Sequence, residues 1–139
     1  MKYLLNSIAK TSQYQEISSS LANGSLPAMA AGLSGVEKAL CIAAMIQGHP
    51  EIPSFLILCP NDTEAQKIYD DLSALSVPAL LYQTKDFNFR NSVESKSKEY
   101  EHRRLFALSK LASEKEYKCV VSGIEAVLQY TIPKEILYS

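Results

Sequence analysis

The stretch that decides the fold is Ser54-Phe55-Leu56-Ile57-Leu58-Cys59, which Pro60 closes. It is a continuous apolar run, as in strands that are covered on both faces. Asn61 then begins a helix, because Glu64 follows three residues later and the two residues match a capping box. The apolar face of this helix repeats at helical spacing and comprises Ala65, Ile68, Leu72 and Leu75. A buried strand that leads directly into an amphipathic helix is typical of parallel α/β folds.

Strands and helices alternate along the rest of the chain. Apolar runs predict strands at 25–31, 54–59, 78–82 and 119–121. Helical spacing predicts helices at 2–22, 36–47, 61–75, about 94–113 and 124–130. A loop that contains Asp86-Phe87-Asn88-Phe89-Arg90 precedes the long helix, whose expected apolar stripe is Tyr100, Leu105, Phe106, Leu108 and Leu111. We therefore expect an α/β fold, a three-layer parallel sheet with helices on both faces, with an N-terminal helical segment over 1–24 and an α/β lobe over 25–139.

The composition excludes several classes of protein. With 14 basic and 15 acidic residues among 139, the net charge is −1, which argues against a free-standing binder of duplex DNA. A hydrophobic fraction of 47% excludes a disordered chain. The spacing of Cys41, Cys59 and Cys119 matches no zinc site or disulfide framework, so we expect free apolar thiols. Apolar runs are too short for a membrane span or a signal peptide, so we expect a cytoplasmic protein without membrane contact.

A glycine-containing turn before the helix 36–47 is the most chemically suggestive feature. A phosphate-binding loop reads Gly-x-x-x-x-Gly-Lys-[Ser/Thr], in which backbone amides wrap the phosphates and the hydroxyl holds magnesium. Here the chain reads Gly32-Leu33-Ser34-Gly35-Val36-Glu37-Lys38-Ala39. The first glycine and Lys38 match, but Glu37 replaces the second glycine and Ala39 replaces the hydroxyl. Because a carboxylate repels phosphate and alanine binds no metal, we predict a disabled phosphate loop without a cofactor. An ordinary joint between a strand and a helix is the alternative.

The other polar residues indicate no active site. His49 and His102 lie too far apart in the sequence to indicate a local metal site. The pair Asp70-Asp71 is similar to the Asp-Glu pair of an ATPase, but it lies within a predicted helix, where a solvated face is the favoured interpretation. We predict no catalytic residue and no metal ligand.

Basic residues gather late in the chain. Between Lys85 and Lys118 lie nine of the 14 basic residues and six of the 15 acidic ones. In the helix 94–113 they form a positive side that comprises Lys96, Lys98, Arg103, Arg104 and Lys110. Glu94–Lys98 and Glu99–Arg103 pairs at four-residue spacing favour a solvated face. A modest surface for nucleic acid or a protein partner is the alternative.

Several stretches, taken in order from about residue 26 to 136, carry a resemblance to a known family. They are Ala31-Gly32-Leu33-Ser34-Gly35, Lys38-Ala39-Leu40, Leu56-Ile57-Leu58-Cys59-Pro60-Asn61-Asp62, Glu64-Ala65, Asp70-Asp71-Leu72, Asp86-Phe87-Asn88-Phe89, Arg103-Arg104-Leu105-Phe106-Ala107-Leu108-Ser109-Lys110-Leu111 and Val120-Val121-Ser122-Gly123-Ile124-Glu125-Ala126-Val127-Leu128-Gln129. Together they resemble the N-terminal, UvrB-like region of the bacterial transcription-repair coupling factor (Mfd).

This resemblance implies a helicase-like (RecA-like) P-loop lobe that has lost ATPase competence, within a longer chain. In that family the whole protein displaces RNA polymerase stalled at a DNA lesion and recruits UvrA for nucleotide excision repair. ATP, Mg²⁺ and DNA are handled by a motor further along the family's chain, and UvrA mainly by a following module. The resemblance therefore implies a non-catalytic lobe that supports structure and contacts protein. Two alternatives remain: a working nucleotide-binding P-loop ATPase domain in which Lys38 contacts phosphate, and a nucleic-acid-binding fragment that uses the basic side of the helix 94–113.

Overall fold

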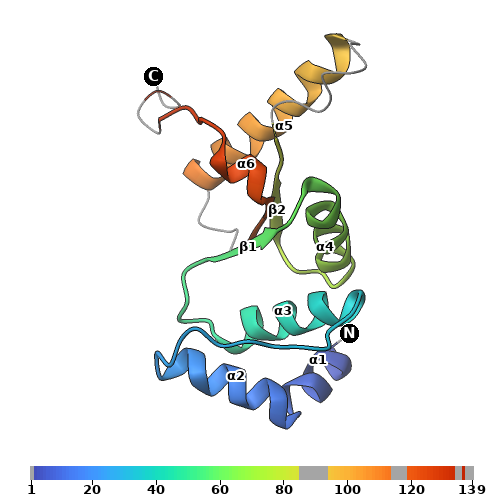
Figure 1. The fold of residues 1–139 in the computed structure, drawn as a ribbon, viewed down its shortest axis with the longest axis vertical. Helices are drawn as coiled ribbons and strands as arrows, with labels where there is room; N and C mark the ends of the chain where they lie inside the picture. The colour runs from blue at the N-terminus through green and yellow to red at the C-terminus, as the bar shows by residue number, and fades with distance from the viewer. Residues whose placement is uncertain (1, 85–93, 114–118, 134–135, 137–139) are drawn as a thin grey trace. The chain divides into compact units, whose positions relative to one another are not determined.

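A computed structural model describes residues 2–84, 94–113, 119–133 and 136 (Figure 1). The chain divides into two compact units. The first, which we call the N-terminal unit, comprises Met1–Pro53 and Asp70–Val77. The second, the sheet unit, comprises Ser54–Tyr69 and Pro78–Ser139. The predicted loop at 86–90 lies outside the described residues, and the expected boundary between residues 24 and 25 stays a prediction.

The N-terminal unit contains the helices α1 (Lys2–Ala9), α2 (Ser12–Ala22) and α3 (Val36–Gly48). The prediction of one helix over 2–22 is wrong, because Thr11 has an extended backbone and its side chain accepts a bond from the Tyr14 amide, 3.4 Å away, which begins a new helix. The stop predicted at Asn23-Gly24 is confirmed, since α2 ends at Ala22 and Gly24 adopts a φ of 68°. Helix α3 confirms the prediction for 36–47.

The strand predicted at 25–31 is absent: these residues have no regular secondary structure, pair with no strand and are all exposed. Two features of the sequence account for this result. Pro27 has no amide hydrogen to donate to a sheet ladder, and four of the seven residues are alanine or serine, which favour strands weakly.

The sheet unit contains three parallel strands, β1 (Phe55–Cys59), β2 (Ala79–Tyr82) and β3 (Cys119–Gly123), in the order β1-β3-β2. Val120 on the central strand lies beside Leu56 on β1 and Leu80 on β2. The helices that follow these strands are α4 (Asp62–Ala74), α5 (Glu94–Ser113) and α6 (Ile124–Leu128). The sheet unit includes α4 only up to Tyr69, and the rest of this helix belongs to the N-terminal unit. The α/β class and the parallel sheet are therefore as predicted, with three strands in place of four among the described residues.

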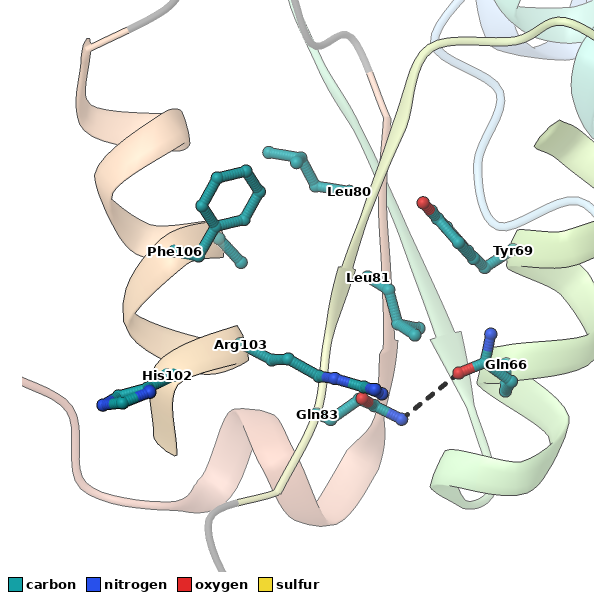
Figure 2. Close-up of a pocket in the computed structure, with 9 residues that line it drawn as sticks. Gln66, Tyr69, Leu80, Leu81, Gln83, His102, Arg103 and Phe106 are labelled. Carbon is teal, nitrogen blue, oxygen red and sulfur yellow. Dashed lines mark hydrogen bonds between the residues drawn. The ribbon is translucent and has the colours of Figure 1, made fainter. Parts of the chain in front are cut away.

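The residues inside the sheet unit explain how the helices are held. Tyr82, Ala107 and Ala126 form a buried cluster against which Leu108 and Val120 pack, and this cluster joins β2, β3, α5 and α6. Helix α4 lies on the other side of β2 from α5 (Figure 2). Its predicted apolar face is confirmed, since all four residues are buried: Ala65, Ile68, Leu72 and Leu75.

The predicted apolar stripe of α5 is wrong in part. Leu105, Phe106 and Leu111 are 38%, 58% and 41% exposed, whereas Arg104 and Ala107 are buried. An arginine lies on the buried face of α5, so the positions of the apolar residues in the sequence do not identify that face correctly. The side chain of Tyr100 lies outside the described part of the chain.

The cysteines are free thiols, as predicted. Cys59 and Cys119 are buried, and burial raises the pKa of the Cys119 thiol to about 11. Cys41 is half-buried in α3, and burial raises its pKa as well. These thiols behave as small apolar side chains of the core.

Candidate functional site

The loop predicted to be a disabled phosphate site leads into α3, and Glu37 in the first turn of this helix bonds back to Ser34 of the loop. The Glu37 carboxylate accepts bonds from the Ser34 amide (3.0 Å) and from the Ser34 hydroxyl (3.1 Å). These bonds, the amide first, lower the pKa of Glu37. The Glu37 carboxylate therefore already accepts a hydrogen bond from one of the backbone amides that a bound anion would need at this helix N-terminus.

The surroundings of the loop also differ from those of a phosphate site. No strand leads into it, since 25–31 is unpaired, although Gly32 and Gly35 adopt φ values of 82° and 45°. Lys38 is exposed, and Ala39 is fully buried on the inward side of α3. The strand predicted before the loop is absent, and position 39 beside Lys38 offers no hydroxyl. Both interpretations of the sequence, a phosphate loop and an ordinary strand-to-helix turn, require that strand.

A cavity of about 750 Å³ borders this loop within the N-terminal unit. Residues of α1, α2, α3 and the segment 25–33 line it, Leu33 and Glu37 among them. Glu16 and Glu37 are the charged residues of this lining, which holds no lysine, arginine or histidine. The cavity therefore favours neither phosphate nor any other anion.

A chain of hydrogen bonds that the sequence analysis missed links α2 to the end of α3. The His49 ring contacts the Ser18 hydroxyl through Nε2 (2.8 Å) and the Glu51 carboxylate through Nδ1 (2.8 Å). This order of groups is that of a hydrolase triad. However, Ser18 lies within α2, where helix bonds use the neighbouring amides, and neither Ser18 nor His49 lines the cavity of this unit described above. The array therefore serves to satisfy a buried histidine.

A cleft of about 530 Å³ follows strand β2 in the sheet unit (Figure 2). Three elements contribute its lining: Gln66 and Tyr69 from α4, Leu80, Leu81 and Gln83 from or next to β2, and His102, Arg103, Phe106 and Ala107 from α5. The side-chain Nε2 of Gln83 donates a hydrogen bond of 3.5 Å to Gln66 Oε1, which links the end of β2 to α4. The lining holds apolar, aromatic, amide and basic groups but no acidic one. We call it the β2 cleft.

Arg104, on the buried side of α5, holds this helix in place. Its side chain is 2% exposed, and its guanidinium carbon lies 4.2 Å from the centre of the Tyr82 ring. Nη1 donates to the carbonyls of Gln83 and Ala126, both at 3.0 Å, and Nη2 donates to the carbonyl of Gln129 at 3.3 Å. Burial lowers the pKa of Arg104. The arginine thus fixes α5 against β2 and α6, and it does not belong to the predicted positive surface.

A second buried network lies where the strands of the sheet end. Asp62 is 6% exposed, and its Oδ2 accepts bonds from the Thr84 amide (2.9 Å) and hydroxyl (2.8 Å). Gly123 lies so close that an added Cβ would meet Asp62 Oδ1 and would stand 2.9 Å from the Asp62 backbone nitrogen. The network joins the start of α4 to the ends of β2 and β3. Asn61 caps α4 as predicted, by accepting a bond from the Glu64 amide at 2.9 Å.

The structure does not bring the other candidate residues of the sequence together into a site. Asp70 and Asp71 lie within α4, as predicted, and not at the end of a strand. Of the predicted basic side, Arg103 lines the β2 cleft and Lys110 lies with its Nζ 5.6 Å from the centre of the Phe106 ring. The side chains of Lys96 and Lys98 lie outside the described residues, as do both predicted ion pairs with Glu94 and Glu99.

Within the described ranges there is no group of three or more histidine, cysteine, aspartate or glutamate side chains that could hold a metal ion. The helices of those ranges are likewise too short or too polar to cross a membrane. Comparisons with protein families, with curated proteins and with solved structures gave no match to this chain.

Proposed function

We propose that this chain is a non-catalytic, RecA-like lobe of a transcription-repair coupling factor, which acts in the cytoplasm by supporting structure and contacting protein. The family resemblance of its sequence motivates the proposal. As in that family, polymerase displacement and UvrA recruitment would belong to the whole protein, and ATP, Mg²⁺ and DNA would be bound by its motor. The lobe itself would catalyse nothing.

The observation that carries the non-catalytic part is the position of Glu37. Its carboxylate takes the amide and hydroxyl of Ser34, at the place where a phosphate loop would present free donors. The buried Ala39 supports the same conclusion, because it offers no hydroxyl to magnesium. The acidic lining of the neighbouring cavity would repel nucleotide phosphates further.

The part that concerns protein contact is supported by exposed apolar side chains in the sheet unit. Phe106 and Leu111 on α5 are 58% and 41% exposed, and Val127 and Leu128 on α6 are 43% and 79% exposed. These exposed side chains leave apolar surface on two helices of the sheet unit, which a protein partner would cover.

Isothermal titration calorimetry with MgATP tests the proposal. We expect no binding heat and no change of the melting temperature, since a ligand that binds the folded state must raise it. Micromolar binding would overturn the proposal in favour of the working P-loop domain, for which the positive φ values of Gly32 and Gly35 and the exposed Lys38 are the supporting observations.

The double variant Glu37→Gly with Ala39→Thr is the matched control for this titration. It removes the carboxylate and places a hydroxyl at the buried position 39, so its melting temperature must first match that of the parent. A gain of weak MgATP binding in this folded variant would identify these two residues as the cause of the lost affinity. No gain would mean that the backbone of the loop has departed from the geometry that holds phosphate.

A further inference from the structure

We propose that the β2 cleft binds an extended, acidic peptide segment of a partner protein, which adds a strand to the free edge of β2. This inference rests on the proposed protein-contact function and assigns it a surface and a ligand class. The three steps that carry it are the position of β2 in the sheet, the shape of the cleft and the charge of its lining.

Strand β2 ends the sheet on one side. In the order β1-β3-β2 it pairs with β3, and the described part of the chain provides no second neighbour for it. An edge strand presents backbone donors and acceptors that an extended peptide can pair with, as in strand addition to peptide-binding domains.

The cleft runs around this edge. Leu80 and Leu81 both line it, although successive residues of a strand point to opposite faces of the sheet. Helices from both faces line it too, with Phe106 on α5 and Tyr69 on α4 (Figure 2). A peptide that pairs with β2 would therefore place alternate side chains against the aromatic ring of Phe106 and against that of Tyr69.

The lining selects the charge of the peptide. His102 and Arg103 belong to the lining, Lys110 lies against Phe106, and no aspartate or glutamate lines the cleft. The one acidic residue of α5 between residues 101 and 113, Glu101, lines a different, smaller cavity together with Arg104. Complementary charge gives specificity and speeds association, so acidic side chains beside apolar ones fit this cleft.

The same lining argues against two other occupants. A second copy of the chain that paired β2 with β2 would bring two basic clusters together, which costs free energy. Single-stranded nucleic acid would use the basic groups and the two rings, but it would leave the edge of β2 and the leucines unpaired. An acidic peptide offers carboxylates to the basic side chains, a backbone to the edge of β2, and apolar side chains to the leucines and rings.

A fluorescence anisotropy titration tests the proposal with the 139-residue chain and a labelled nine-residue peptide in which valine alternates with glutamate. We expect saturable binding that weakens as salt rises. Two control peptides have lysine in place of glutamate, or N-methyl groups on alternate amides along one edge. Both should bind at least about tenfold more weakly, because the first reverses the charge and the second removes the donors of a strand.

Variants of the protein locate the site. Arg103→Glu should weaken binding of the glutamate peptide by about tenfold or more, and Phe106→Ala by about fivefold. Both side chains are exposed, so melting temperatures should stay within about 2 °C of the parent. Lys38→Glu, the same charge reversal at an exposed position of the N-terminal unit, should leave the affinity unchanged. Amide hydrogen exchange should slow in β2 and not in β1 when the peptide binds.

Several results would overturn the inference: no binding of the glutamate peptide, equal binding of the lysine peptide, or unchanged affinity in both Arg103→Glu and Phe106→Ala. Dimerisation of the chain that becomes stronger in the Arg103→Glu variant would also overturn it. So would binding of a twelve-nucleotide oligothymidylate that displaces the peptide. The MgATP titration is independent of all these outcomes. If neither the peptide nor MgATP binds, only the proposed peptide surface is rejected. If MgATP binds, the non-catalytic function is rejected.

Discussion

Two helix N-termini in this protein have opposite structural characters. Helix α3 begins after a glycine-containing loop whose residues are all exposed, and its amide and hydroxyl donors at Ser34 turn to the neighbouring Glu37. Helix α4 begins two residues after strand β1, and its first residue, Asp62, is buried and accepts hydrogen bonds from Thr84, which follows strand β2. In each case one carboxylate accepts an amide and a hydroxyl. The first arrangement is local and solvated, and the second joins distant parts of a sheet.

The difference teaches what a glycine motif can and cannot indicate. At Gly32 and Gly35 an added Cβ would meet nothing within 4 Å, so these glycines serve the backbone conformation only. At Gly123 an added Cβ would meet the Asp62 carboxylate and backbone, so this glycine serves close packing. A loop that cradles a ligand needs both properties together with a strand that fixes it. The loop before α3 has only the first.

Removal of Arg104 should have the largest effect on the sheet unit. In Arg104→Ala the carbonyls of Gln83, Ala126 and Gln129 lose a buried donor and a cavity opens beside Tyr82. We expect a loss of about 3 kcal/mol in the free energy of unfolding, measured by urea denaturation. Arg104→Lys should recover only part of it, because an ammonium lacks the planar fork. Equal stability of Arg104→Ala and the parent would contradict the account.

Paired glycine substitutions compare the two helix starts directly. Gly123→Ala should cost about 2–3 kcal/mol, because the methyl group would press on the backbone of residues 61 and 62. Gly32→Ala should cost about 1 kcal/mol, the strain of a positive φ in open space. Both free energies come from denaturant midpoints and slopes. The reverse order would show that the loop before α3 is the more tightly packed of the two.

The two hydroxyls that bond to carboxylates provide a smaller test. Thr84→Val removes the 2.8 Å bond to buried Asp62 and should cost about 1–2 kcal/mol. Ser34→Ala removes the 3.1 Å bond to exposed Glu37, where water replaces the lost donor, and should leave the melting temperature unchanged. Similar losses in both variants would remove the distinction between the two sites.

The titration of Glu37 should show the smallest effect. Its pKa should lie below the ordinary value of 4.5, because the Ser34 amide and then the Ser34 hydroxyl donate to the carboxylate. Ser34→Ala should move the pKa part of the way back, since the amide bond remains. Folding therefore gains from this group above its unfolded-state pKa and loses the gain as the pH falls through the lower folded-state value. NMR of the side-chain carbonyl measures the pKa, and an ordinary value would mean that the loop bonds do not form in solution.

Sequence patterns predicted the elements of the sheet unit well. The position of the strand at 54–59, the cap at Asn61 and the buried face of α4 follow from local rules, and the structure agrees with them. The expectation that this strand is covered on both faces is wrong, because Leu56 and Leu58 on one face of β1 are 56% and 52% exposed. The orientation of α5 could not be predicted in this way, because the inward position is an arginine whose partners are three backbone carbonyls and an aromatic ring. Nothing in the local sequence indicates those partners.

The candidate sites were predictable to different degrees. The substitutions in the loop 32–39 predict a disabled phosphate loop, which stays a prediction, whereas the missing strand before it and the bonds from Ser34 to Glu37 needed the structure. The β2 cleft needed the structure entirely, since Gln66, Leu80 and Arg103 come from three separate elements. Asp62 and Thr84 are likewise 22 residues apart. Only the pairing order of the strands brings such residues together.

The central claim is that Glu37 engages the amide and hydroxyl of Ser34 in the loop before α3, and that this loop binds no nucleotide. The most direct measurement follows the backbone amide signals of residues 32–39 by ¹⁵N NMR while MgATP is added to the folded chain. The account predicts that these signals keep their positions at millimolar MgATP. Saturable shifts of the Ser34, Gly35 and Lys38 amides at micromolar MgATP would contradict it.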